Sequence, residues 1–279
     1  MNTFSYNINN DTVCCLACCD GEIRDISILR SSEETNKDLI PMATDSIARL
    51  IKTHSEKPVR FRYPPIEKGQ KQENMLVNAC RLDDAEFDFR KTPFSINSSI
   101  ASMHRSNRVS FVSFDNTEQP YKLYTDASVV DSRDPSISSC LLNSQNEILH
   151  MVSTSIKWVD NVTTAELIAG YLGLRICESN NVEKVEWYCD NNSVLRFVNG
   201  ESEDKIHDSY FSNNTRSIFQ RYDQYNNNRI SGDKNKLADS MAKDIRHEEV
   251  DNRLEFRSPA FEDHSGVDEI LGDIQKRTN

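Results

Sequence analysis

Hydrophobic and polar residues follow the clearest pattern in the part of the chain that begins near residue 121. Apolar and β-branched residues alternate with polar ones in three short segments, which predicts β-strands at 121–128, about 136–142 and about 147–156. The next segment, 163-TTAELIAGYLGLRIC-177, instead repeats its apolar residues every three or four positions. This longer period predicts a helix with one buried face directly after the strands.

Five further elements are expected after this helix. The patterns predict a strand, two helices, another strand and a last helix, at 184–189, 192–199, about 207–223, about 228–231 and about 235–246. The order is therefore β-β-β-α-β-α-α-β-α. We expect residues 119–250 to form an α/β domain in which helices flank a mixed five-stranded sheet.

The rest of the chain gives weaker patterns. A smaller α+β domain of unknown role is expected over 1–118, from a hairpin at 12–30, a helix at 41–54, a strand at 58–63, a helix near 95–104 and a strand at 108–114. Residues 251–279 are polar and acidic, and we interpret them as a C-terminal tail with a short helix near 266–275.

Composition narrows the class of protein. The chain has 279 residues, of which 37% are hydrophobic and 28% charged, which is typical of globular domains. No apolar stretch is long enough to cross a membrane and no secretory signal is recognisable, so we expect an intracellular, cytoplasmic protein, although nothing separates cytoplasm from nucleus. The net charge of -11 argues against a general nucleic-acid coat but permits a nucleic-acid enzyme with a small site.

Four of the eight cysteines lie in 14-CCLACC-19. A zinc site would need a second pair of ligands at matching spacing, and the other four cysteines are isolated. The run is apolar and precedes the turn signal Asp20-Gly21. We interpret these cysteines as small buried residues of a strand, and leave metal binding or redox chemistry open as the alternative.

Four carboxylates stand at informative places in the predicted domain. Asp126 interrupts the first strand, Glu166 lies near the start of the long helix, Asp190 follows the fourth strand, and Asp239 lies near the start of the last helix. Each has a simple explanation by itself. Asp126 could be a partly exposed strand residue, and Glu166 could form a capping box with Thr163. Asp190 could cap the helix after the fourth strand, and Asp239 could form an ion pair with the residue four positions later.

A common explanation accounts for all four acids together. Parallel neighbouring strands would place Asp126 beside Asp190, and the long helix would bring Glu166 to the same point. Unpaired carboxylates at such distances repel one another and raise one another's pKa. A divalent cation removes this conflict, and Mg²⁺ prefers oxygen ligands. Two such ions form a known arrangement for phosphodiester hydrolysis.

The motifs around these acids resemble the ribonuclease H family. The similar segments are YTDAS (124–128), TAELIAGYLGL (164–174), YCDNNSVLRFVNG (188–200) and NKLADSMAK (235–243), and the resemblance is closest to the reverse-transcriptase-like group of that family. It implies a ribonuclease H-like fold over residues 121–248. It covers less than half of the chain and does not extend to residues 1–114.

The resemblance also implies an activity. It assigns Asp126, Glu166, Asp190 and Asp239 to the catalysis and to the binding of two Mg²⁺ ions, for which Mn²⁺ can substitute. The implied substrate is an RNA–DNA hybrid, whose RNA strand is cut to leave 5′-phosphate and 3′-hydroxyl ends. The implied substrate-binding residues are Ser128, Asn192 and Asn235, the last of which fits better as a residue that orders the turn before the final helix.

Two features depart from the family. The turn before the last helix, 231-SGDK-234, lacks the histidine that some members carry, and the segment 201-ESEDKIHDSYF-211 is acidic where many members carry a basic helix. These departures keep an alternative open, in which the domain is a non-catalytic scaffold or a nucleic-acid- or protein-binding subunit of a larger assembly, with the N-terminal domain as a contact for a protein partner. Another nuclease on the same fold is a further alternative. The Glu on the first helix and the order Asp-Ala-Ser in the first strand argue against it.

Overall fold

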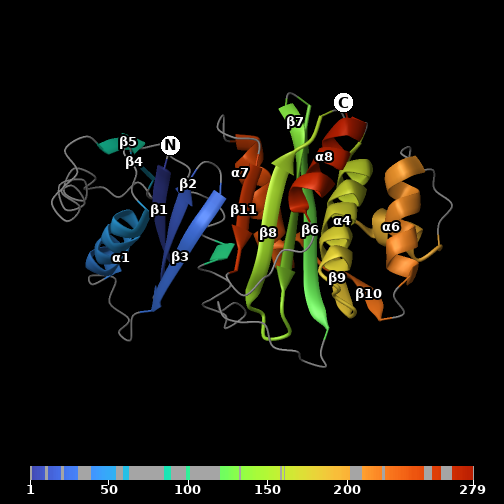
Figure 1. Cartoon of the computed structure of the whole chain (residues 1–279), viewed down its shortest axis with the longest axis horizontal. Helices are drawn as coiled ribbons and strands as arrows, with labels where there is room; N and C mark the ends of the chain where they lie inside the picture. The colour runs from blue at the N-terminus through green and yellow to red at the C-terminus, as the bar shows by residue number, and fades with distance from the viewer. Residues whose placement is uncertain are drawn as a thin grey trace. The chain divides into compact units, whose positions relative to one another are not determined.

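The chain forms two compact units, Met1–Val109 and Ser110–Asn279. They are drawn in Figure 1. The computed structural model describes residues 2–9, 12–19, 22–30, 39–54, 59–62, 85–88, 99–100, 120–131, 133–157, 159, 161–201, 209–221, 224–247, 253–258 and 266–278.

The N-terminal unit is built on a meander of three antiparallel strands. These are β1 (Asn2–Asn9), β2 (Thr12–Cys19) and β3 (Glu22–Arg30), and helix α1 (Leu39–His54) packs against them. Two short strands, β4 (Val59–Arg62) and β5 (Ala85–Asp88), follow in parallel with β1 and with each other. The strand order within this unit is therefore β3-β2-β1-β4-β5.

The predicted hairpin at 12–30, the helix at 41–54 and the strand at 58–63 are confirmed in this unit. Strand β1 was not predicted. Of the helix expected near 95–104 only residues 99–100 are described, and they are helical, whereas the strand expected at 108–114 lies outside the described residues. The cysteines of the CCLACC run belong to β2, and the three described side chains among them, Cys14, Cys15 and Cys18, are buried.

The second unit carries a six-stranded mixed sheet. Strands β6 (Tyr121–Val130), β7 (Arg133–Leu142) and β8 (Ile148–Ser155) form an antiparallel meander, and β9 (Val185–Cys189) and β10 (Tyr225–Arg229) run parallel to β6. The order within this unit is β10-β9-β6-β7-β8-β11. The five predicted strands are present, although β10 begins three residues before its predicted start.

The sixth strand comes from residues 251–279, which were predicted to be a tail, and the short helix predicted there near 266–275 is confirmed. Strand β11 (Arg253–Arg257) pairs antiparallel with β8, and α8 (Val267–Thr278) packs against α4. Strand β11 contains charged residues, so its sequence is not typical of a buried strand. Glu255 is nevertheless buried, and the His150 Nε2 atom lies 2.9 Å from its Oε1 atom. The sheet therefore has six strands rather than the expected five.

Helices cover both faces of this sheet (Figure 1). Helices α4 (Val162–Ser179), α5 (Asn192–Val198) and α6 (Ser209–Arg221) lie on one side and α7 (Lys236–His247) on the other. The Ser138 hydroxyl of β7 donates to the Ala238 carbonyl of α7 at 2.7 Å, which fixes that helix over the centre of the sheet. No helix in the described ranges is long and apolar enough to span a membrane.

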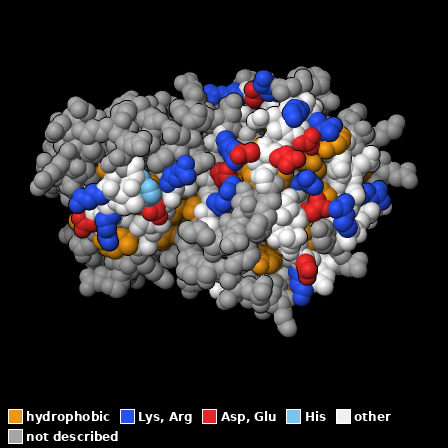
Figure 2. Space-filling view, viewed as in Figure 1, with side chains coloured by type: hydrophobic (Ala, Val, Ile, Leu, Met, Phe, Trp, Pro, Cys, Tyr) orange, Lys and Arg blue, Asp and Glu red, His pale blue; other side chains and the backbone are white. Residues whose placement is uncertain are grey.

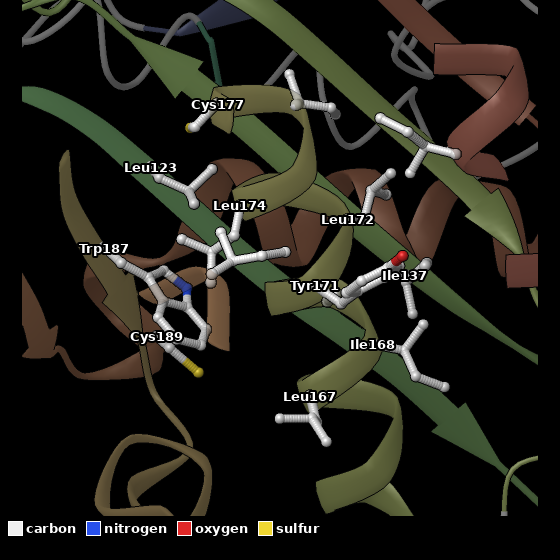
Figure 3. Close-up of a cluster of buried hydrophobic side chains, with 14 of the residues drawn as sticks. Leu123, Ile137, Leu167, Ile168, Tyr171, Leu172, Leu174, Cys177, Trp187 and Cys189 are labelled. Carbon is white, nitrogen blue, oxygen red and sulfur yellow. The ribbon is translucent and has the colours of Figure 1, made fainter. Parts of the chain in front are cut away.

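The core of the second unit lies between α4 and the sheet (Figure 3). Leu123, Leu172 and Trp187 are fully buried there. Gly170 allows the close approach of α4, because a Cβ atom at that position would lie 2.3 Å from a ring carbon of Trp187. The indole Nε1 atom donates to the Thr125 Oγ1 atom at 2.8 Å, so this packing also fixes β9 beside β6 next to Asp126.

Candidate active site

Two parallel strands bring the first pair of acids together. Asp126 lies in β6, and Asp190 directly follows β9. The two strands pair with Tyr124 opposite Tyr188, so the residues two positions further on occupy neighbouring places on the same face. Asp126 is only 5% exposed, which excludes the explanation of a partly exposed strand residue.

Helix α4 brings Glu166 to the same place. The helix begins at Val162, and the Asn161 side chain accepts the Thr164 N–H at 2.9 Å, so Asn161 is the cap. The capping box between Thr163 and Glu166 is therefore not formed. Glu166 is 4% exposed, and the backbone N–H of Ala127 in β6 partly offsets the rise in its pKa that burial causes.

Asp190 is likewise not used as a helix cap. The Asn191 side chain caps α5 instead, accepting the backbone N–H groups of Ser193 at 3.0 Å and Val194 at 3.3 Å. The polar groups that begin α4 and α5 are thus satisfied by asparagines, and the carboxylates beside them remain available for another partner.

The acids raise one another's pKa, as expected for unpaired carboxylates in one place. Burial first, then the charges of Asp190 and Asp239, raise the pKa of Asp126 to about 8. Burial, with Asp126 and Asp190, raises the pKa of Glu166 well above its usual value. Burial and Asp239 also raise the pKa of Asp190. All four predicted acids therefore belong to one electrostatic cluster.

Asp239 has one cationic neighbour. Its carboxylate lies 2.7 Å from the Lys243 ammonium group, one helical turn later, so the ion pair considered for it is present. The side chains of Asp239 and Lys243 are 33% and 47% exposed, and such pairs are weak. Lys243 also lowers the pKa of Asp126, although burial and the other acids outweigh it.

The three residues assigned to substrate binding lie in different environments. Asn235 is fully buried, and its Nδ2 atom donates to the Thr125 carbonyl at 2.9 Å and to the Asp126 carboxylate at 3.3 Å. In this arrangement it positions Asp126 and has no surface for substrate. Ser128 is buried in β6, whereas Asn192 is exposed as the first residue of α5.

One neighbour of the acids was missed by the sequence analysis. The Cys189 Sγ atom lies 3.9 Å from the Glu166 Oε2 atom and accepts the Asn191 N–H at 3.4 Å. Ligand atoms of Glu166, Cys189 and Asp190 lie within 4.8 Å of one another. The alternation of β9 assigns Cys189 to the core, and nothing in the sequence distinguishes it from other buried cysteines.

The donor atoms of the cluster suit a hard divalent cation. The four carboxylates supply oxygen ligands, the type that Mg²⁺ and Mn²⁺ prefer, and a bound cation would remove the repulsion that raises their pKa values. The softer Cys189 sulfur borders the cluster beside Glu166.

The strand order, the helices on both faces and the acid cluster define a ribonuclease H-like α/β domain. The particular family is indicated by residues 124–245, which match the family described as reverse transcriptase-like. The resemblance inferred from the four motifs is thereby confirmed over that segment. The match covers less than half of the chain and leaves the N-terminal unit unassigned.

Solved structures of low identity are similar to the chain. Ribonuclease H1 from the archaeon Halobacterium salinarum is 16% identical, with 45% of this chain and 96% of that chain covered and a TM-score of 0.42. The N-terminal ribonuclease H domain of a Mycobacterium tuberculosis protein is 14% identical, with coverages of 45% and 91% and a TM-score of 0.42.

A foamy viral protease–reverse transcriptase, solved in complex with an RNA/DNA hybrid, is 14% identical, with coverages of 87% and 38% and a TM-score of 0.39. No curated protein matches the chain. The class therefore rests on the strand order, the motifs and the family match rather than on these scores.

Proposed function

We propose that residues 121–248 form a metal-dependent endoribonuclease that hydrolyses the RNA strand of RNA–DNA hybrids. The observation that carries this proposal is the cluster of Asp126, Glu166, Asp190 and Asp239, in which burial and mutual repulsion raise the pKa values of the first three. Packing acids together in this way is unfavourable unless a cation binds them. The four motifs and the family match support the substrate class.

The four acids would hold two Mg²⁺ ions, which when bound supply an activated water and stabilise the leaving 3′ oxygen. The surrounding residues keep the acids in place. Asn235 donates a hydrogen bond to the Asp126 carboxylate and holds it in place. Asn192 is exposed one residue beyond the Asn191 cap, where an amide can read 2′-hydroxyl groups of the RNA strand.

The test is cleavage of a labelled RNA–DNA hybrid with Mg²⁺ or Mn²⁺, beside RNA–RNA, DNA–DNA and single strands. The full chain is compared with Asp190→Asn and with Asp131→Asn, a control that alters an exposed acid in the turn after β6. We expect cutting of the hybrid that is lost in the first variant and kept in the second. Cutting of another substrate with the same loss would retain the metal site and reject the hybrid specificity.

The second candidate function is a non-catalytic module within a larger assembly. The observation that favours it is the ion pair between Asp239 and Lys243, because the ammonium group already neutralises one of the four carboxylates that a metal would bind. In this case the folded protein cuts none of the substrates, and residues 1–118 would be the region that contacts a protein partner.

A further inference from the structure

A second polar site lies at a distance from the acids, on the helices that cover the core. A cavity of about 360 Å³ opens between α4, α6 and α8. Its α4 wall is the C-terminal half of that helix, from Tyr171 to Glu178, whereas Glu166 lies near the N-terminal end. Its third wall, α8, lies outside the segment 124–245 that matches the family. Basic and acidic side chains gather on this face (Figure 2).

Each of the three helices contributes a cation to the cavity. These are Arg175 from α4, Arg221 from α6 and Lys276 from α8. Lys276 is exposed in the cavity wall, and no hydrogen bond or ion pair joins it to a described residue. Donors of positive charge therefore remain available in the cavity after the contacts within the protein have been made.

Two of the acids in the wall are already satisfied. Glu178 lies between the two arginines, 2.7 Å from Arg175 and ion-paired with Arg221. Asp273 accepts the hydroxyl groups of Tyr171 at 3.3 Å and Tyr210 at 2.8 Å.

The Arg277 Nε atom, 3.0 Å away, completes the contacts of Asp273, whose pKa is lowered by these hydrogen bonds although burial opposes them. Glu178 thus positions the two arginines of the cavity, and Asp273 is already engaged by the two tyrosines and by Arg277, which lies outside the cavity wall. Glu269, exposed in the first turn of α8, is the exception.

We propose that this cavity binds a phosphate monoester of nucleotide size. A phosphate dianion offers the acceptors that two guanidinium groups and an ammonium group bind best. The volume exceeds that of a bare anion and lies within the range of small-ligand pockets. Asn214, Ser217 and Ile270 line the remaining wall and would contact the esterified group.

The experiment is isothermal titration of the full chain with AMP, inorganic phosphate and adenosine. It is carried out in EDTA on Asp190→Asn, so that neither hydrolysis nor a metal at the acid cluster contributes. We expect AMP to bind more tightly than inorganic phosphate, and adenosine not to bind. Arg221→Met and Lys276→Met should each weaken AMP binding roughly 10- to 100-fold, the range for losing one charged hydrogen-bond partner.

The matched control is Arg216→Met, on the same helix as Arg221. Arg216 packs over the Phe197 ring at 5.9 Å and is absent from the cavity wall, so AMP binding should be unchanged. Failure of AMP to bind, equal binding of adenosine, or equal losses in Arg216→Met and Arg221→Met would overturn the proposal. The result does not depend on the nuclease assay, since an inactive variant is used throughout.

Discussion

The two units of the chain share one arrangement of strands but not its chemistry. In each, an antiparallel meander of three strands is followed by a helix, and then by two strands that run parallel to the first strand of the meander. The orders β3-β2-β1-β4-β5 and β8-β7-β6-β9-β10 correspond strand for strand. The N-terminal unit, which was predicted to be an α+β domain, therefore has the same strand topology as the second unit, which was predicted to be an α/β domain.

The difference lies at the places that hold the acids. Asp126 is the sixth residue of β6, and the sixth residue of β1 is Asn7, which is also buried but uncharged. Glu166 is the fifth residue of α4, and the fifth residue of α1 is the small apolar Ala43. These positions have corresponding places in the two units, and the choice of residues makes only the second unit's positions a candidate active site.

The largest effect is expected from exchanging the residues at the first of these places. Asp126→Asn should lower the rate of hybrid hydrolysis on the order of 10³-fold, because it removes a carboxylate that the proposed metal site requires. Asn7→Asp in the N-terminal unit should leave the rate unchanged within about a factor of two. Single-turnover cleavage of a labelled hybrid measures both. A comparable loss in the two variants would show that the N-terminal unit shares in catalysis.

The acid cluster should also make the stability of the metal-free protein depend on pH. The pKa of Asp126 is raised to about 8 in the folded chain, so the folded state binds more protons than the unfolded state between about pH 4 and pH 8. The free energy of unfolding therefore falls as pH rises through this window, by up to about 1.4 kcal/mol per pH unit for one such group.

Denaturation with urea in EDTA at pH 5 and pH 8 tests this dependence. Asp126→Asn should flatten the profile, and added Mg²⁺ should restore stability at pH 8, because a bound cation offsets the repulsion. Asn7, the residue at the corresponding place in the N-terminal unit, carries an amide that does not titrate in this range. An identical pH profile for the wild type and Asp126→Asn would contradict the electrostatic account of the cluster.

Sequence patterns predicted the second unit better than the first, for a physical reason. Strands β7 and β8 and helix α4 are buried along most of their length, so their sequences are rich in apolar residues and their elements are easy to recognise. Strand β10, with the sequence YNNNR, was placed three residues too late because asparagine is disfavoured in strands, and its pairing with β9 and the buried Tyr225 hold it in the sheet. Strand β1 has the sequence NTFSYNIN, in which three apolar residues alternate with polar ones. It was missed because the polar residues outnumber the apolar ones.

The candidate site was partly predictable in the same sense. The four acids could be found because the motifs place them within or directly beside predictable elements. The caps could not, because Asn161 and Asn191 each lie within two residues of another residue able to cap the same helix. The contact between Asn235 and Asp126 joins residues 109 positions apart and depends on the placement of α7 over β6. Such contacts are set by packing, which local sequence does not encode.

A smaller effect is expected from the glycines that bring α4 onto its sheet, since α1 contains none. Gly170→Ala should lower the free energy of unfolding by about 1–3 kcal/mol, because its Cβ atom would lie 2.3 Å from the Trp187 ring. Gly272→Ala, in the interior of α8, is the control and should raise it by about 0.5–1 kcal/mol, because nothing lies within 4 Å. Urea denaturation followed by tryptophan fluorescence measures both. Similar changes in the two variants would mean that α4 does not depend on this close approach.

The smallest effect on cleavage is expected from replacing Lys243, the cation beside the acids of the second unit. The Lys243 ammonium group lies 2.7 Å from Asp239 and competes with any metal for that carboxylate. Lys243→Gln should therefore lower the Mg²⁺ concentration for half-maximal cleavage, by up to about fivefold, since a pair this exposed contributes less than about 1 kcal/mol. Lys236→Gln, exposed at the start of the same helix, is the control and should have no effect. A higher Mg²⁺ requirement in Lys243→Gln would show instead that the ammonium group helps to assemble the site. Lys243 would then be one of the residues that give the second unit a chemistry that the N-terminal unit lacks.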